Sequence, residues 1–144
     1  MENTNETRFL NGIKNVIGTN IKSTRTLEVG GLLVCKKTTA KCNSLDEITI
    51  KSTLVELDTL AGGGSDSLKY IYMDQSLGDK TPDGTIVRIT GKVGVTEILC
   101  LSTGNMDMNN QGAIQIKPSN FVNFMWVESR GKWVWCSGSE CSIA

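Results

Sequence analysis

Few residues of this 144-residue chain could do chemistry, and histidine is not among them. Without histidine, no Ser-His or Cys-His catalytic pair and no histidine-ligated metal site can form. An enzyme would have to use carboxylates, lysine, tyrosine or a bound cofactor. No particular pair of acids stands out as the two carboxylates of a glycosidase. We therefore expect a protein with no catalytic residues, no metal and no cofactor.

The five cysteines are the next candidates, and they are Cys35, Cys42, Cys100, Cys136 and Cys141. An odd number without a secretory signal favours reduced thiols and a cytosol-like compartment. Cys100, in the apolar stretch TEILCL, is expected to be a small buried hydrophobe. The other four could form a zinc site, although their inner spacings of six and four residues are looser than zinc knuckles prefer. A disulfide between two of the four is the other alternative.

The acidic side chains of the central region lie in or beside turns, where aspartate caps backbone N–H groups. They are Asp58, Asp66, Asp74, Asp79 and Asp83. A calcium site built from Asp66, Asp74 or Asp79 is an alternative, but the spacing is not that of an EF-hand. We expect these aspartates to be structural.

Two glycine-containing stretches could suggest a phosphate-binding loop. Gly62, Gly63, Gly64 and Ser65 are not followed by a Gly-Lys-Ser/Thr sequence or by a helix pattern. The stretch GTIVRITGK, 84–92, lacks the P-loop spacing and its terminal Ser or Thr. Both are expected to be ordinary loops.

From residue 46 onward the chain alternates apolar and polar residues in short runs. EITI and LVELD are out of phase, which predicts a break near Ser52. LKYIYMD places Leu68, Tyr70 and Tyr72 on one face of a strand, and Pro82 and Gly84 predict a turn. Short strands separated by glycine loops predict an all-β fold, an antiparallel β-sandwich of jelly-roll type.

The stretch FVNFMWVESRGKWVW, 121–135, contains all three tryptophans. ESRG predicts a four-residue hairpin loop in which Gly131 adopts a left-handed conformation. This register places Trp126 opposite Trp133 and Phe124 opposite Trp135, so that four aromatic rings share one face of the hairpin.

This aromatic hairpin has two interpretations. Each ring can remove roughly 150–250 Å² from water, which favours the core or a subunit interface. The alternative is a platform on which Trp126, Trp133 or Trp135 stacks against sugar rings.

The N-terminal segment 1–25 is expected to be an arm. Its apolar residues recur at helical spacing, and they are Phe9, Leu10, Ile13, Val16 and Ile17. A helix this short is marginal alone and needs a surface to lie on. We therefore predict two parts: a docking arm over 1–25 and a β-domain over 26–144.

Two stretches carry a resemblance to a known group of proteins. TLEVGGLLV, with Leu27, Val29 and Leu33 around a Gly-Gly pair, is similar to the short repeats of phage and viral fibre shafts. The pattern PDGTIVRI, GAIQIKP and FVNFMWVESRGKWVW over 82–135 resembles the C-terminal domain of virion fibre and capsid-decoration proteins. That resemblance implies a homotrimeric β-sandwich on a virus surface, without catalysis, in which Leu27, Val29 and Leu33 make shaft-like subunit contacts.

The expected function is therefore that of a virion structural protein: a capsid-decoration or minor capsid protein, or a short fibre knob. A single shaft-like repeat disfavours a long fibre. We expect it to be made in the host cytoplasm, to assemble with itself and with other capsid proteins, and to dock through its arm. A lectin-like module that binds glycans is the alternative. Equal numbers of basic and acidic residues, 15 each, argue against nucleic acid, and no apolar stretch is long enough for a membrane.

Overall fold

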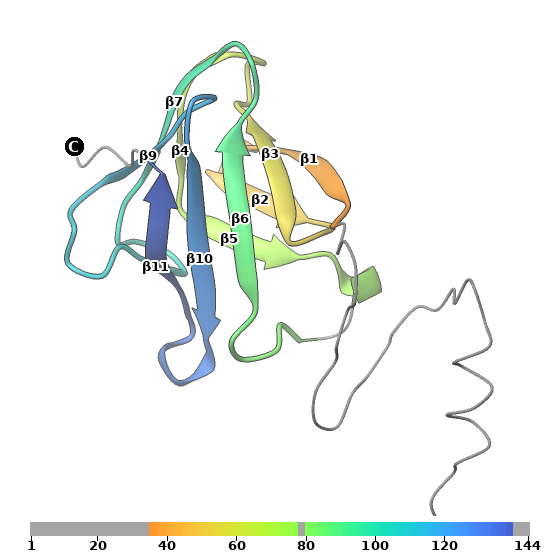
Figure 1. Ribbon diagram of the computed structural model, residues 1–144, viewed down its shortest axis with the longest axis vertical. Helices are drawn as coiled ribbons and strands as arrows, with labels where there is room; N and C mark the ends of the chain where they lie inside the picture. The colour runs from red at the N-terminus through yellow and green to blue at the C-terminus, as the bar shows by residue number, and fades with distance from the viewer. Residues whose placement is uncertain (1–34, 78–79, 140–144) are drawn as a thin grey trace, which may run out of the picture. The chain divides into compact units, whose positions relative to one another are not determined.

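The computed structural model of the protein describes residues 35–77 and 80–139 (Figure 1). The predicted boundary between residues 25 and 26 lies outside these ranges, as do the predicted arm and shaft-like contacts Phe9, Leu10, Ile13, Val16, Ile17, Leu27, Val29 and Leu33. The described residues form eleven strands: β1 Lys37–Lys41, β2 Glu47–Ile50, β3 Leu54–Asp58, β4 Gly64–Leu68, β5 Tyr70–Met73, β6 Ile86–Gly91, β7 Val95–Cys100, β8 Met106–Asp107, β9 Ile114–Ile116, β10 Phe121–Val127 and β11 Lys132–Ser139.

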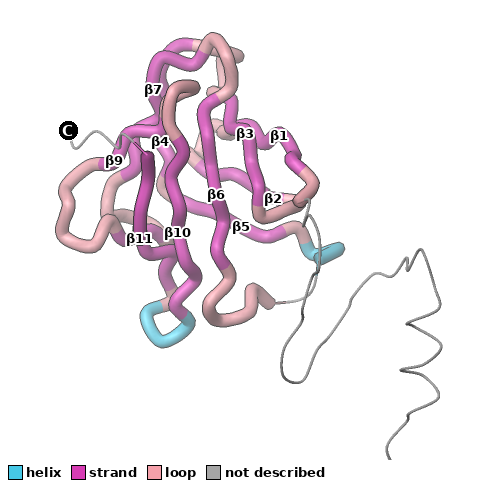
Figure 2. The backbone as a smooth tube through the Cα atoms, in the orientation of Figure 1, coloured by secondary structure: helices cyan, strands magenta, loops and turns pink. Residues whose placement is uncertain are grey.

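The prediction of an all-β fold is confirmed over the described residues (Figure 2). Helical structure there is limited to two short 3₁₀ turns, η1 Gln75–Leu77 and η2 Glu128–Arg130. Within the same ranges no helix has the length and hydropathy needed to span a membrane. The predicted break near Ser52 is also confirmed, because β2 ends at Ile50 and β3 begins at Leu54 in another sheet.

The strands are distributed over three sheets. The largest sheet has the order β1-β3-β6-β10-β11-β8, and the others are β2-β5 and β4-β7-β9. Figure 1 shows β6, β10 and β11 side by side, with β5 crossing behind β6. Buried apolar residues of all three sheets form one core cluster.

The chain winds through these sheets twice in the same order. Strands β2, β3 and β4 each lie in a different sheet, and β5, β6 and β7 then pair in parallel with β2, β3 and β4. A parallel partner requires a crossover of a dozen or more residues, commonly a helix. Here two strands in the other sheets supply each crossover, so no helix is needed.

This winding corrects the predicted antiparallel arrangement. Five of the eight strand pairings in the described ranges are parallel and three are antiparallel. The antiparallel pairs come late in the chain, where β9 pairs with β7 and the β10–β11 hairpin pairs with β6. The sheets are therefore mixed.

The core is built from rows of apolar side chains that lie in register across neighbouring strands. In the six-stranded sheet, Val55 pairs with Ile89, and Ile89 pairs with Val122. All three are fully buried. Because partners in register point to the same face, the two turns of the winding and the hairpin cover one continuous interior.

The turn before β6 has the geometry that its sequence predicts. The Thr85 N–H donates to the Pro82 carbonyl at 3.2 Å, and Gly84 has a φ of 82°. The carboxylate of Asp83 accepts the Glu128 N–H at 2.9 Å, which ties this turn to the tip of the hairpin. Leu68 differs from the prediction: it belongs to β4 and is buried, whereas Tyr72 of β5 is 44% exposed.

Candidate functional site

The aromatic hairpin has the predicted register. Trp126 pairs with Trp133 and Phe124 pairs with Trp135 across β10 and β11. Gly131 closes the loop at a φ of 59°, which is the left-handed region. The prediction of the hairpin from the sequence is thus confirmed in both register and turn.

The four rings of the hairpin pack inward. Phe124 and Trp133 are 0% and 1% exposed, and Trp126 and Trp135 pack against the core while partly buried. The Trp126 and Trp133 rings are 5.6 Å apart at 59°. The indole N–H of Trp133 donates to the Ile71 carbonyl of β5 at 3.1 Å, so the hairpin also holds the two-stranded sheet.

A second side chain holds β5 at the same place. The Asn105 amide donates to the Ile71 carbonyl at 2.8 Å and accepts the Ile71 N–H at 2.9 Å. These two bonds replace those of a neighbouring strand, so β5 has no unsatisfied edge at Ile71. Asn105 therefore fixes the position of β5 against the loop that leads into β8.

A pocket of about 650 Å³ lies where β2, β5, the start of η1, residues 80–81, Asn105 and the hairpin come together. Its lining includes the buried Ile71 and Trp133 and the exposed Tyr72. The remaining lining residues are Thr49, Met73, Asp74, Gln75, Lys80, Thr81, Asn105 and Trp126. The pocket thus combines aromatic faces with hydroxyl, amide and carboxylate groups.

The charges of this pocket are partly balanced. Hydrogen bonds from the Ser76 hydroxyl and N–H lower the pKa of Asp74, and Lys51 adds to this effect, so Asp74 is a carboxylate at neutral pH. Lys80 forms an ion pair with Glu128 of the hairpin tip. Partial desolvation, followed by the charge of Glu47, raises the pKa of Tyr72, so its hydroxyl keeps its proton and can donate.

The glycine loop after β3 is a structural loop, as predicted. Gly62, Gly63 and Gly64 have φ values of 80°, 123° and 73°, and their three N–H groups are all used inside the protein. The Gly62 and Gly63 N–H groups donate to the carbonyl and hydroxyl oxygens of Thr59, at 3.1 and 2.8 Å, and Gly64 donates to Gly94 at 3.0 Å. A phosphate-binding loop needs free backbone N–H groups, and the three glycine N–H groups are already used in hydrogen bonds within the protein.

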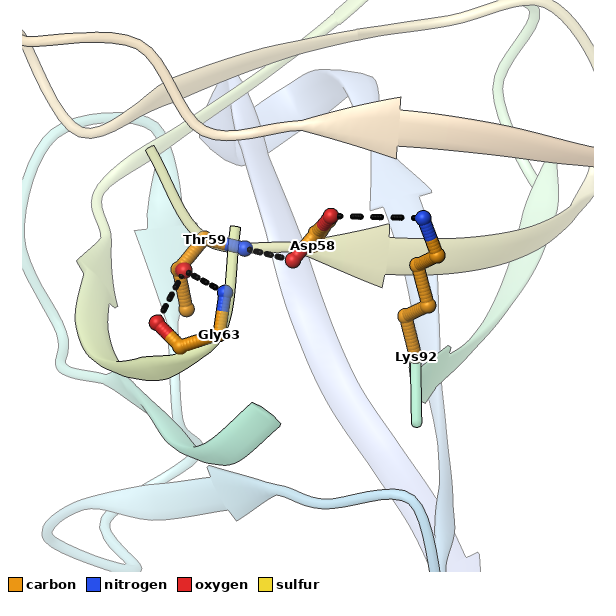
Figure 3. Close-up of polar contacts among 4 residues, drawn as sticks. All are labelled: Asp58, Thr59, Gly63 and Lys92. Atoms are coloured by element: carbon orange, nitrogen blue, oxygen red, sulfur yellow. Dashed lines mark hydrogen bonds and ion pairs between the residues drawn. The ribbon is translucent and has the colours of Figure 1, made fainter. Parts of the chain in front are cut away.

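Figure 3 shows how this loop is anchored. The Thr59 hydroxyl also donates to the Gly63 carbonyl at 2.5 Å, and Asp58 accepts the Thr59 N–H at 2.9 Å. The second carboxylate oxygen of Asp58 lies 3.5 Å from the Lys92 ammonium. Asp58 therefore acts as a cap and an ion-pair partner.

The other described aspartates of the predicted set also accept backbone N–H groups. Asp66 accepts the N–H groups of Leu60 and Ser67, and Asp74 accepts that of Ser76. Asp79 lies outside the described ranges. Across the residues that the structure describes, no three His, Cys, Asp or Glu side chains cluster as a metal site would require.

Four of the five cysteines are described. Cys100 is fully buried on β7, which confirms the predicted small core residue. Cys42 is also buried, whereas Cys35 and Cys136 are exposed thiols. The Cys136 thiol lies 3.2 Å from the Asn123 carbonyl. Cys141, the fourth member of the suggested zinc set, lies outside the described ranges.

The environment of Cys42 predicts an unreactive thiol. Burial is the largest cause that raises its pKa to about 12, and the carboxylates of Asp66, Asp46 and Asp58 add to the effect. At pH 8 we expect iodoacetamide to modify Cys35 in the native protein and to leave Cys42 unmodified until urea is added, because the thiolate is the nucleophile. Peptide mass spectrometry measures both sites. Equal rates at the two cysteines in native protein would contradict the burial.

Some of the pocket residues were predictable from the sequence and others were not. The structure brings Trp126 and Trp133 together in the pocket but leaves Trp135 outside its lining. No sequence pattern places Asn105 or Thr49 beside them, because both come from distant parts of the chain. Comparisons with known protein families and with curated proteins found no match to this sequence.

Proposed function

We propose that this protein is a virion structural protein, a capsid-decoration or minor capsid protein or a short fibre knob. The observation that carries the proposal is the inward packing of the aromatic hairpin, with Phe124 and Trp133 buried in the core. A hairpin that cements β-layers is the structural use expected for such residues in a scaffold. The sandwich of β-layers implied by the resemblance is part of this proposal.

Assembly requires apolar surface that can be covered by another copy. Leu60 and Val93 are 50% and 89% exposed, in two loops that the bond from Gly64 to Gly94 holds together. Burial of such groups contributes roughly 25 cal/mol per Å² before the costs of association are subtracted. We propose that this end of the β-domain contributes to the contact between copies in a homotrimer.

The N-terminal arm completes the proposal. Its apolar residues at helical spacing, Phe9 and Leu10 among them, would dock on other capsid proteins. Many copies on a shell would give the arm the surface that a short helix needs. In this proposal the protein is made in the host cytoplasm and then becomes part of the virion.

The alternative, a lectin-like module that presents Trp126, Trp133 or Trp135 to sugar rings, has less support as the main function. Trp133 is 1% exposed, and its indole N–H is bonded to the Ile71 carbonyl. Such a module would need these rings in contact with water. The pocket beside the hairpin is a different kind of site, because it exposes Tyr72 and only part of the hairpin.

The assembly proposal predicts a stable trimer of the isolated chain. Size-exclusion chromatography with light scattering should give three times the chain mass at micromolar concentration. We expect Val93→Lys to weaken the trimer at least tenfold, because an ammonium would have to be desolvated in the contact. The control, Thr39→Lys on the exposed face of β1, should leave it unchanged. A monomer at every accessible concentration would refute self-assembly.

A further inference from the structure

We propose that the pocket beside the hairpin binds a short neutral saccharide, with its sugar rings against Tyr72 and Trp126 and its hydroxyls on Asp74 and its neighbours. This role goes beyond assembly and does not depend on the oligomeric state. The pocket volume of about 650 Å³ is within the range of small-molecule sites, roughly 300–1,000 Å³.

The aromatic part of the pocket is held in place before any ligand binds. Tyr72 stacks on Tyr70 with ring centroids 5.9 Å apart and planes at 8°. Trp126 packs against Trp133 at 5.6 Å. Rings that are already fixed lose little entropy on binding. The flat face of such a ring matches the C–H face of a sugar, which is apolar although its rim is polar.

Tyr72 lines the pocket and remains accessible to a ligand. The residue is 44% exposed, whereas Ile71, the preceding residue of β5, is 1% exposed. Its hydroxyl keeps its proton at neutral pH, so it can both donate and accept. An exposed ring with a polar tip beside a concave surface is common in binding sites.

The polar groups around the rings match hydroxyl groups. Asp74 is a carboxylate that accepts hydrogen bonds, and Thr49 and Thr81 have hydroxyls that both donate and accept. Gln75 adds an exposed amide. The Asn105 amide nitrogen donates one of its two hydrogens to the Ile71 carbonyl, and that bond does not use the second hydrogen. An apolar ligand would leave these groups without water and without partners, which costs free energy.

The charges favour a neutral ligand over an anionic one. Asp74 bears a negative charge inside the pocket, and the positive charge of Lys80 is already paired with Glu128. The Asp74 carboxylate would repel an anionic sugar, and the described lining residues include no unpaired cation to offset this repulsion. Lys51 offsets part of the Asp74 charge but does not line the pocket.

A second, smaller pocket of about 290 Å³ lies on the outer face of the six-stranded sheet and serves as a comparison. It is lined by Leu54, Arg88 and Asn123, among others. The Arg88 guanidinium already donates to the Asn123 amide at 3.0 Å and lies over the ring of Phe121 at 4.4 Å. Because Arg88 and Asn123 bond to each other, this pocket has fewer unused hydrogen-bonding groups for a ligand than the pocket beside the hairpin.

The test is an NMR titration of the full chain with lactose, maltose and N,N′-diacetylchitobiose. We expect saturable binding of at least one of them, with a Kd below about 10 mM, and shifts centred on β5 and the hairpin. The variants Tyr72→Ala and Asp74→Asn should each weaken binding about tenfold, which corresponds to about 1.4 kcal/mol. The matched controls Leu45→Ala and Glu56→Gln lie outside the pocket lining and should bind as the native chain does.

Several results would overturn the inference. They are the absence of saturable binding to all three sugars, unchanged affinity in both pocket variants, shifts centred on the outer face of the six-stranded sheet, or tighter binding of 3′-sialyllactose than of lactose. Unfolding midpoints in urea check that Tyr72→Ala and Asp74→Asn are folded. A monomeric chain that still binds sugar would refute the trimer and leave this inference standing.

Discussion

Replacement of Trp133 by alanine is expected to lower the free energy of unfolding by about 3–5 kcal/mol, which is the range for a buried Trp or Phe replaced by Ala. Trp133 is 1% exposed, contacts the Trp126 ring and donates its indole N–H to Ile71. The substitution leaves a cavity and removes one of the two side-chain bonds to the Ile71 carbonyl. Urea unfolding followed by far-UV circular dichroism measures the change.

Two further variants separate the causes of this loss. Trp133→Phe keeps a ring but removes the indole N–H, and we expect a smaller loss of about 1–3 kcal/mol. Ile86→Ala removes a side chain that is 50% exposed and should cost less than about 1 kcal/mol. If Trp133→Ala costs no more than Ile86→Ala, the hairpin does not cement the core and the assembly proposal loses its main support.

The second large effect is expected for Gly104→Ala. Gly104 has a φ of 60°, and a Cβ atom there would meet the carbonyl oxygen of Lys69 and the ring of Tyr70. The left-handed backbone costs about 1–2 kcal/mol for alanine, and overpacking adds about 1–3 kcal/mol. We expect a total loss of about 2–5 kcal/mol in urea unfolding.

Gly131→Ala is the matched control for this prediction. Gly131 has nearly the same φ, 59°, but a Cβ atom there would meet nothing within 4 Å. Its loss should therefore contain the backbone cost alone, about 1–2 kcal/mol. Equal losses at the two glycines would mean that the loop before β8 can move away from β5. In that case the position of Asn105 beside Ile71 would not be fixed by packing.

Local signals were sufficient for the hairpin. Aromatic residues at alternating positions flank ESRG, and Gly131 can adopt the left-handed conformation that this loop needs. These facts fix which residues face each other, because the turn sets the register of an antiparallel pair. Aspartates beside turns were predictable for the same reason, since a cap and the N–H group that it binds are close in sequence.

The direction of the strands was not predictable in this way. Apolar alternation in β3 and β6 identifies the inward residues, Val55 and Ile89 among them, but alternation is the same for parallel and antiparallel partners. Short strands separated by glycine loops predict an antiparallel sandwich, and parallel strands are more commonly joined by helices. The chain instead uses strands of the other sheets as crossovers, and the correct partners are 34 residues apart in the case of Val55 and Ile89.

The candidate pocket was likewise predictable only in part. The sequence by itself determined the all-β composition, the hairpin and the lack of histidine chemistry, because these depend on residue types and on neighbours within a few positions. Only the tertiary structure decided that Tyr72, Asp74, Asn105 and Trp126 line one pocket. These residues are brought together by the double winding and by the Asn105 bonds to Ile71. Long-range pairing of this kind depends on the packing of the whole domain, and a local sequence pattern carries no information about that packing.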